Sequence, residues 1–259
     1  MSALPGTGEG ETGPTLGDPL GIVLRRFMES ADRDVTPLLI ERDDGLIETM
    51  APKQFLDEPS GPTADWVLER VRGRVLDIGA GAGRFAIPLQ TRGRAVTALD
   101  VSEGALDVCR SRGIEDLFLG TVEELRSANE RPQFDTLLLM GNNLGLLGDD
   151  RAAARFLDAL RALCAEDGIV LAEGMDALAT EDPRHRAYHR RNAAMGRPRG
   201  LVRFRVRAGN VVSPWMEYRW PAFDDVAALL AANSWEIRAE LRDGAQYVVE
   251  LAPLSLQRA

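Results

Sequence analysis

The chain has 259 residues, 45% of them apolar and 27% charged, which is the composition of a globular protein with one large domain or two small ones. No apolar run reaches the roughly 18 residues that a membrane span needs, and the first residues lack a secretory signal pattern. Two cysteines and two histidines argue against a disulfide scaffold, a four-cysteine zinc site and a histidine-rich metal site. The net charge of -9 argues against a general nucleic-acid binder. We therefore expect a cytoplasmic, metal-free protein that does not enter a membrane.

The first 62 residues show no regular hydrophobic period. Residues 1–17 are rich in Gly, Pro, Thr and Glu and predict a disordered tail. A short helix is expected over 20–28, whereas 37–60 mixes Pro, Asp, Gly and isolated apolar residues and is interpreted as irregular. Residues 18–62 are therefore predicted to form an N-terminal cap region, after which Thr63 is expected to cap a helix.

Strands and helices alternate between residues 74 and 172. The expected strands are 74–78, 95–99, 117–119, 134–140 and 169–172. Ser102 is expected to cap one connecting helix, and Asp149 or Asp150 begins another that Gly168 closes. Phe134 and the run 137–140 are apolar, which is typical of a strand buried on both faces. The alternation predicts an α/β fold with a doubly wound, mostly parallel sheet over 63–259.

Residues 176–220 interrupt this alternation and form a predicted insertion. Its first half is polar, basic and weakly helical. Val202, Phe204 and Val206 then alternate with arginines, which predicts a half-buried strand, and Gly209-Asn210 predicts a turn into a return strand over 211–220. A helix over 223–232 follows, and Asp243-Gly244 predicts a hairpin of strands 235–241 and 246–251.

A glycine loop follows the first expected strand, with the pattern D-x-G-x-G-x-G at residues 77–83. Its glycines permit positive φ and let a ligand approach the backbone, and the next helix offers free N–H groups. Asp100 ends the second strand, where a carboxylate can accept both hydroxyls of a ribose. Two ligand classes remain open at this point. Gly81–Ala86 fits a dinucleotide fingerprint, whereas a nucleoside ligand without a pyrophosphate would use Asp77 together with the glycines.

This segment resembles the class I S-adenosylmethionine-dependent methyltransferases. The resemblance covers 63–175 and, more weakly, 222–252. Four motifs carry it in order: 77–83, Ala98-Leu99-Asp100-Val101-Ser102, Gly120-Thr121-Val122-Glu123 and Phe134-Asp135. It implies a Rossmann-like fold, S-adenosylmethionine as the cofactor and methyl transfer as the reaction.

The resemblance also implies roles for individual residues. Asp77 and the loop residues Gly79, Ala80, Gly81 and Gly83 would surround the methionine part of the cofactor. Asp100 would hold the ribose, Val101 would pack on the adenine, and Thr121 and Val122 would lie at the adenine edge. The backbone at Met140 and Gly141 would meet the amino acid group. Many relatives have Asp where this chain has Thr121, so the contact to the adenine amino group is weaker here.

The residues that meet the methyl acceptor are less marked, because methyl transfer needs alignment and exclusion of water more than an acid or base. Asn142, Asn143, His185 and Trp215 are candidate substrate-binding residues. Glu173, Tyr188 and His189 are candidate catalytic residues, with a base needed only for an acceptor that keeps its proton. Each has a structural alternative: turn hydrogen bonds for the asparagines, a helix cap or surface charge for Glu173, a solvated helix face for the residues from 185 to 189, and core packing for the tryptophan.

Nine arginines between residues 184 and 207 lie in a stretch without Asp or Glu. They are open to three interpretations: binding of an anionic substrate, contact with nucleic-acid phosphates, or salt bridges with acidic surface elsewhere, which we favour. The insertion 176–220 is predicted to cover a small-molecule methyl acceptor together with the N-terminal cap. A methyltransferase acting on RNA or protein, and a cofactor-binding protein without turnover, are the alternatives. The sequence leaves the oligomeric state open.

Overall fold

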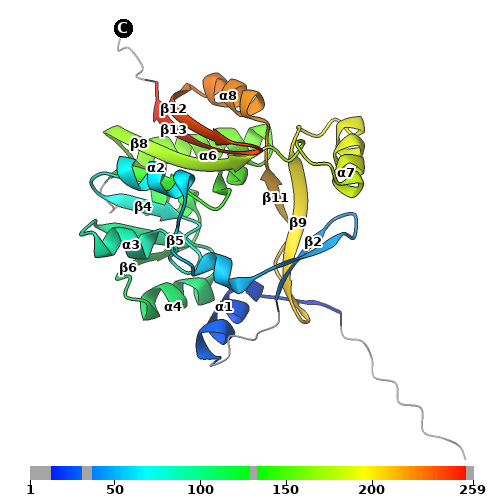
Figure 1. Ribbon diagram of the computed structural model, residues 1–259, viewed down its shortest axis with the longest axis horizontal. Helices are drawn as coiled ribbons and strands as arrows, with labels where there is room; N and C mark the ends of the chain where they lie inside the picture. Colours follow the sequence, from blue (N-terminus) through cyan, green and yellow to red (C-terminus); the bar gives the residue numbers. More distant parts are fainter. Residues whose placement is uncertain (1–12, 31–36, 129–132, 255–259) are drawn as a thin grey trace, which may run out of the picture.

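The computed structural model describes residues 13–30, 37–128 and 133–254, and most of the predicted N-terminal tail lies outside this range. Two β-sheets form the framework (Figure 1). One has seven strands in the order β12-β13-β8-β7-β4-β5-β6, and the other has six, in the order β1-β10-β9-β2-β3 with β11 also paired to β9. The chain enters the six-stranded sheet twice, once before and once after most of the seven-stranded sheet has formed.

The seven-stranded sheet confirms the predicted α/β fold. Its parallel strands are β4 (Val75–Ile78), β5 (Val96–Asp100), β6 (Asp116–Leu119), β7 (Phe134–Leu139) and β8 (Cys164–Met175). The C-terminal hairpin of β12 (Trp235–Asp243) and β13 (Gln246–Pro253) adds to it, with β13 antiparallel to β8. One expected boundary is wrong, because β8 begins at Cys164 and already contains Gly168 and Glu173.

Helices cover both faces of this sheet. One layer holds α2 (Pro62–Arg70), α3 (Ala86–Thr91) and α4 (Glu103–Ser111), and the other holds α5 (Val122–Ser127), α6 (Asp150–Leu163) and α8 (Phe223–Ala232). Along β7, Leu137 and Leu139 pack into the core on the α6 side, and Leu138 packs into the core on the α3 side. This two-sided burial explains why residues 137–139 are apolar without alternation. Helix α2 begins after Gly61 with Pro62 at its first position, so Thr63 is not its cap.

The six-stranded sheet overturns the expectation of an irregular cap over 37–60. Its strands are β1 (Thr15–Leu16), β2 (Leu38–Arg42), β3 (Ile47–Met50), β9 (Leu201–Ala208), β10 (Val211–Val212) and β11 (Met216–Arg219). Strands β2 and β3 form a hairpin, β2 pairs with β9, and a short 3-10 helix, η1 (Pro52–Phe55), follows. The return strand after β9 is interrupted between Val212 and Met216. The N-terminal region and the insertion therefore build one sheet, in which even Thr15 and Leu16 pair.

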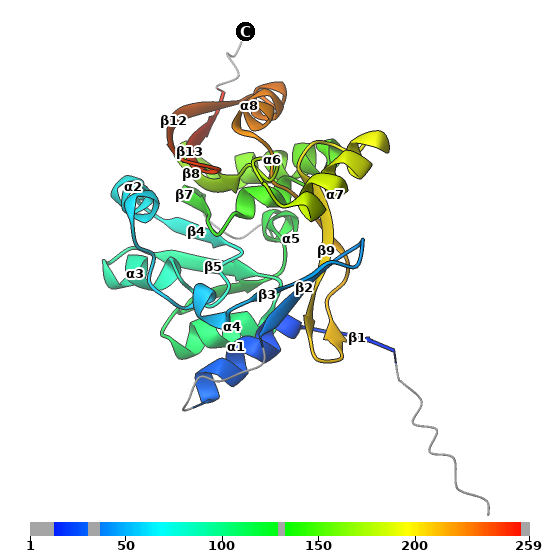
Figure 2. The same cartoon turned by 45° about the vertical axis from the view of Figure 1, so that its right-hand side comes forward.

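Helix α1 (Pro19–Glu29) is fixed to α4 by a shared cap. The carboxylate of Asp18 accepts a hydrogen bond from Gly21 N in its own helix. It also accepts from Ser102 Oγ and Gly104 N at the start of α4. The two backbones touch, because a Cβ placed on Gly104 would lie 2.5 Å from the Cα of Gly21. Figure 2 shows α1 lying along α4 beside the six-stranded sheet.

Candidate functional site

The loop between β4 and α3 holds the three glycines of the motif in left-handed conformations, with φ of 69°, 55° and 81° at Gly79, Gly81 and Gly83. Gly81 has a second reason to lack a side chain, since Phe55 of η1 lies 3.1 Å from where its Cβ would stand. Asp100, at the end of β5, accepts hydrogen bonds from Gly81 N (2.8 Å) and Ser102 N (2.9 Å). Asp100, the residue predicted to bind the ribose, is thus hydrogen-bonded directly to the glycine loop.

Asp77 and Asp100 are buried at this loop, and neither forms an ion pair with a described residue. Burial raises the pKa of Asp77 to about 7, the charge of Asp100 adds to the rise, and a backbone hydrogen bond from Ala86 opposes it. Burial also raises the pKa of Asp100, and the charge of Asp18 adds to that rise, against the hydrogen bonds from Ser102 and Gly81. Buried carboxyls without a counter-ion favour a ligand that brings positive charge.

The raised pKa of Asp77 makes stability depend on pH in a defined direction. The folded protein holds this proton up to about pH 7, whereas an unfolded aspartate releases it near pH 4. The stability that the proton contributes is present below about pH 4 and is lost as the pH rises through 7. We expect the melting temperature of the wild type, relative to Asp77→Asn, to fall between about pH 5 and about pH 8. Differential scanning fluorimetry measures this difference, and Asp57→Asn controls for the change in net charge. A difference that stays constant with pH would contradict the assignment.

Two apolar side chains are exposed at the carboxyl ends of β5 and β6. Val101, expected to pack on an adenine, is 66% exposed, and Leu119 is 54% exposed. Leu119 pairs with Asp100 across the two strands, so the three residues lie together. Sequence reasoning missed Leu119, although its place at the end of the third parallel strand was a signal. Large exposed apolar side chains beside a buried carboxyl suit the base of a nucleoside.

Thr121 and Val122, expected at the adenine edge, have structural roles here. Thr121 caps α5: its Oγ1 accepts from Glu124 N, and the Glu124 carboxylate accepts from Thr121 N. Val122 is buried in the core between α5 and α6. The Thr121 hydroxyl is therefore already engaged within the chain, which further weakens the expected contact with the adenine amino group.

The segment after β7 is held by Glu173 and Asn143. Gly141 and Asn142 are both left-handed, and Glu173 Oε2 accepts from their amides at 2.7 Å and 3.4 Å. Asn143 Nδ2 donates to the carbonyls of Ile78 and Gly79. Glu173 Oε2 and Asn143 Nδ2 thus position backbone, whereas Glu173 Oε1 and Asn143 Oδ1 form no hydrogen bond with a described residue. Met140 is buried in the core beneath this segment. Asn142 Oδ1 is buried without a hydrogen-bond partner in the described part of the chain.

Two aromatic residues of the six-stranded sheet face this segment: Tyr218 in β11 and Trp220 directly after it. Tyr218 and Trp220 lie against Gly145 of η2 (Asn143–Leu147), where a Cβ would stand 2.5 Å from Tyr218 Cδ1 and 3.0 Å from Trp220 Nε1. Both rings contact Phe204 of β9. Burial, and to a smaller extent the charge of Asp100, raises the pKa of Tyr218 well above its usual range. Its hydroxyl bonds to none of the described residues, so Tyr218 is a site residue that the sequence analysis did not select.

Trp215, the predicted substrate-binding residue of this segment, is engaged by two arginines. It precedes β11, and Arg203 and Arg205 lie over its ring at 5.3 Å and 4.8 Å. Side chains alternate along a strand, so these two arginines lie on the face of β9 opposite Phe204. Trp215 therefore lies away from Tyr218 and Trp220, on the other face of the sheet.

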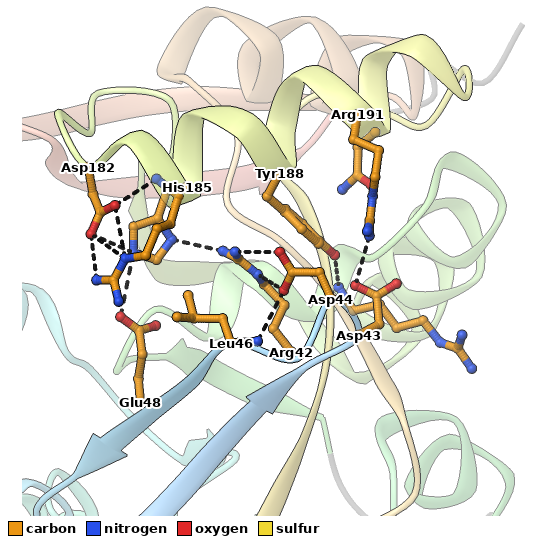
Figure 3. A network of polar contacts seen from close by, with 12 residues as sticks. Arg42, Asp43, Asp44, Leu46, Glu48, Asp182, His185, Tyr188 and Arg191 are labelled. Carbon is orange, nitrogen blue, oxygen red and sulfur yellow. Dashed lines mark hydrogen bonds and ion pairs between the residues drawn. The ribbon is translucent and has the colours of Figure 1, made fainter.

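Helix α7 (Pro183–Ala194) is fixed to the β2–β3 hairpin by a polar network (Figure 3). Arg42 Nη1 lies 2.9 Å from His185 Nδ1, and Glu48 lies 3.5 Å from His185 Nε2. The Tyr188 ring lies 4.0 Å below the Arg42 guanidinium, and its hydroxyl accepts from Arg203 N. His185, the predicted substrate-binding residue, and Tyr188, the predicted catalytic residue, are thus engaged in packing the insertion. His189 differs, because it lines a cavity and its pKa is lowered by burial and then by the charge of Arg42.

The fold and the site can now be compared with known proteins. The family described as a methyltransferase domain matches residues 75–168, which hold the glycine loop, Asp100 and the end of β7. A methyltransferase from Bacteroides fragilis, solved with S-adenosyl-L-homocysteine, superimposes with a TM-score of 0.76 over 93% of this chain and 99% of its own, at 22% identity. Residues 75–168 therefore match a methyltransferase domain, and the chain has the fold of the methyltransferase from Bacteroides fragilis.

Curated relatives of this chain match a shorter segment. The chain is 41% identical over 70 residues to an uncharacterised methyltransferase of Mycobacterium tuberculosis, which is 26% of this chain and 29% of the relative. It is 39% identical over 82 residues to a ubiquinone biosynthesis O-methyltransferase of Alkalilimnicola ehrlichii, which is 28% of this chain and 33% of the relative. The matches thus span a third or less of these relatives. No helix among the described residues has the length and apolar character of a membrane span.

Proposed function

We propose that this protein transfers a methyl group from S-adenosylmethionine to a small-molecule acceptor. The observation that carries the proposal is the pair of buried carboxyls beside the glycine loop, Asp77 and Asp100, neither of which forms an ion pair with a described residue. A dinucleotide would bring an anionic pyrophosphate to this loop, whereas S-adenosylmethionine brings a sulfonium and an ammonium group. The electrostatics therefore support the nucleoside alternative over the dinucleotide one.

The residues present fit this cofactor. Asp100 would accept from the ribose hydroxyls, and the exposed side chains of Val101 and Leu119 would flank the adenine. Asp77 and the orphaned Asn142 Oδ1 supply acceptors for an ammonium group. Gly141 and the glycine loop present backbone at the same edge of the sheet. Bound S-adenosylmethionine supplies a methyl group already activated by the positive sulfur.

The chain's own part in the reaction is to hold and align the reactants and exclude water. Glu173 and Asn143 fix the backbone after β7 through the hydrogen bonds described above. Tyr218 keeps its proton at neutral pH and can donate it in a hydrogen bond to an acceptor oxygen or nitrogen. His189 is neutral at that pH and is the candidate base for an acceptor that must lose a proton.

The six-stranded sheet supports a small acceptor. Its aromatic residues pack against Gly145 in the segment after β7, and Phe55 of the N-terminal region covers Gly81 of the glycine loop, so the insertion and the N-terminal region both contact segments at the carboxyl ends of the parallel strands. One relative is named as an O-methyltransferase of ubiquinone biosynthesis, which acts on a small molecule. We also infer a cytoplasmic location, which the two free, buried cysteines support.

Isothermal titration calorimetry with S-adenosylmethionine, S-adenosylhomocysteine and NAD tests the proposal. We expect both adenosyl ligands to bind and NAD to give no heat of binding. Binding of NAD alone would overturn the proposal. Release of S-adenosylhomocysteine on incubation with small-molecule acceptors, but not with RNA or protein, then separates the proposed function from its alternatives.

A further inference from the structure

The insertion encloses a cavity of about 330 Å³ that shares only His189 with the residues of the proposed reaction. It lies between the segment that follows β8 and helix α7. Leu178, Ala193 and Pro198 give it apolar walls, and Arg186, His189 and Arg190 approach from one face of α7. No Asp or Glu lines it.

The arginines of the insertion fall into two groups. Six of the nine in 184–207 form ion pairs: Arg184 with Asp182, Arg191 and Arg197 with Asp43, Arg199 with Asp225, and Arg205 and Arg207 with Glu41. For these, the favoured interpretation as salt bridges is confirmed. Arg203 lies over the Trp215 ring. Arg186 and Arg190 are the other two arginines of this stretch that form no ion pair with a described residue, and they have no ring contact there either.

Arg186 and Arg190 stand one helical turn apart and both line the cavity. Arg186 donates only to the carbonyl of Thr180, and Arg190 has no hydrogen bond or ion pair with any described residue. Both are exposed, so a ligand reaches them from solvent. Each guanidinium group presents several N–H donors in one plane, and two such groups can hydrogen-bond the oxygens of a carboxylate or a phosphate group.

We propose that this cavity binds a small organic anion, with its carboxylate or phosphate between Arg186 and Arg190 and its apolar part against Leu178, Ala193 and Pro198. The site is separate from the cofactor loop, and its detection needs no methyl transfer. His189 lies in the same lining, and a bound anion would favour its charged form.

Nuclear magnetic resonance of the histidine rings tests this directly, because the chain has only His185 and His189. The probes are benzoate and phenyl phosphate, and benzamide is the uncharged control of the same shape. We expect saturable shifts of the His189 signal with the anions, with a dissociation constant on the order of millimolar, and little change for His185. The tighter anion identifies the preferred group. His185→Gln assigns the two signals.

Arg190→Gln is the decisive variant, because Arg190 has no partner to lose within the described chain. We expect it to weaken benzoate binding at least about tenfold, which is 1.4 kcal/mol, and Arg186→Gln with Arg190→Gln to abolish it. Arg155→Gln, on an exposed face of α6, removes the same charge elsewhere and should leave binding unchanged. Equal shifts with benzamide, or full binding by Arg190→Gln, would overturn the proposal.

Discussion

Replacing Asp100 by Asn is expected to weaken S-adenosylhomocysteine binding by roughly 30- to 100-fold. The carboxylate now accepts from two backbone amides, Gly81 N and Ser102 N, and would also accept from the ribose. An amide keeps one acceptor oxygen and turns a donor toward the others, and hydrogen bonds to a charged group contribute about 1.5–3 kcal/mol. The loss of binding therefore combines a lost ligand contact with a disturbed glycine loop.

Calorimetry with the wild type and the variant measures this effect. Asp107→Asn is the matched control, since it removes the same charge from the surface of α4, where Asp107 pairs with Arg25 and Arg110. The melting temperature of Asp100→Asn should change little, because relief from burying a charge offsets a lost hydrogen bond. Unchanged affinity would refute the ribose assignment, and a large loss of stability would show that the carboxylate acts mainly on the fold.

Replacing Gly104 by Ala is expected to destabilise the protein by about 3 kcal/mol and lower its melting temperature by roughly 10 °C. Alanine in a helix normally gains up to about 1 kcal/mol over glycine, so the expected sign is the reverse of the intrinsic one. The reason is the close approach of α1, because the new Cβ would lie 2.5 Å from Gly21 Cα and 2.8 Å from Gly21 C. Backbone atoms cannot turn aside as a side chain does, so α1 must move off α4.

Thermal unfolding by circular dichroism checks this prediction. Gly21→Ala should behave in the same way, because its Cβ would lie 2.6 Å from Gly104 Cα. Gly13→Ala is the control, since nothing lies within 4 Å of the Cβ it would add. If Gly104→Ala were as stable as the wild type, α1 would not be seated on α4 as described.

The parallel sheet and the cofactor loop were predictable from the sequence because their signals are local. An apolar run such as 137–139 in β7 and a glycine motif after a strand each depend on only a few neighbouring residues. The second sheet was not predictable, because β2 gains its partner, β9, from a segment more than 150 residues later. Short strands with isolated apolar residues are determined by pairing with a distant strand rather than by a hydrophobic periodicity in their own sequence.

The acceptor side of the site was predicted less well for the same reason. His185, Tyr188 and Glu173 are polar residues near the right strand ends, but their partners are Arg42, Arg203 N and Gly141 N. A polar side chain with a distant partner looks free in the sequence. Tyr218 is the opposite case, since it looks like core packing, yet its hydroxyl bonds to no described residue. Tyr218 and Trp215 are an odd number of residues apart, which predicts opposite faces of the strand, and this was the one signal in the sequence that could have distinguished them.

The interleaved origin of the six-stranded sheet limits how this protein can be rebuilt. Its strands come from residues 15–50 and 201–219, and the pairing of β2 with β9 joins the two segments. In addition, Asp18 at the start of α1 accepts a hydrogen bond from α4. A chimaera that takes only the insertion from a relative would receive β9 without the hairpin that fits it. A truncation to the cofactor-binding part would remove Asp18, which accepts hydrogen bonds from Ser102 and Gly104 at the start of α4. Specificity would have to be transplanted as two segments at once, and natural divergence of one would constrain the other.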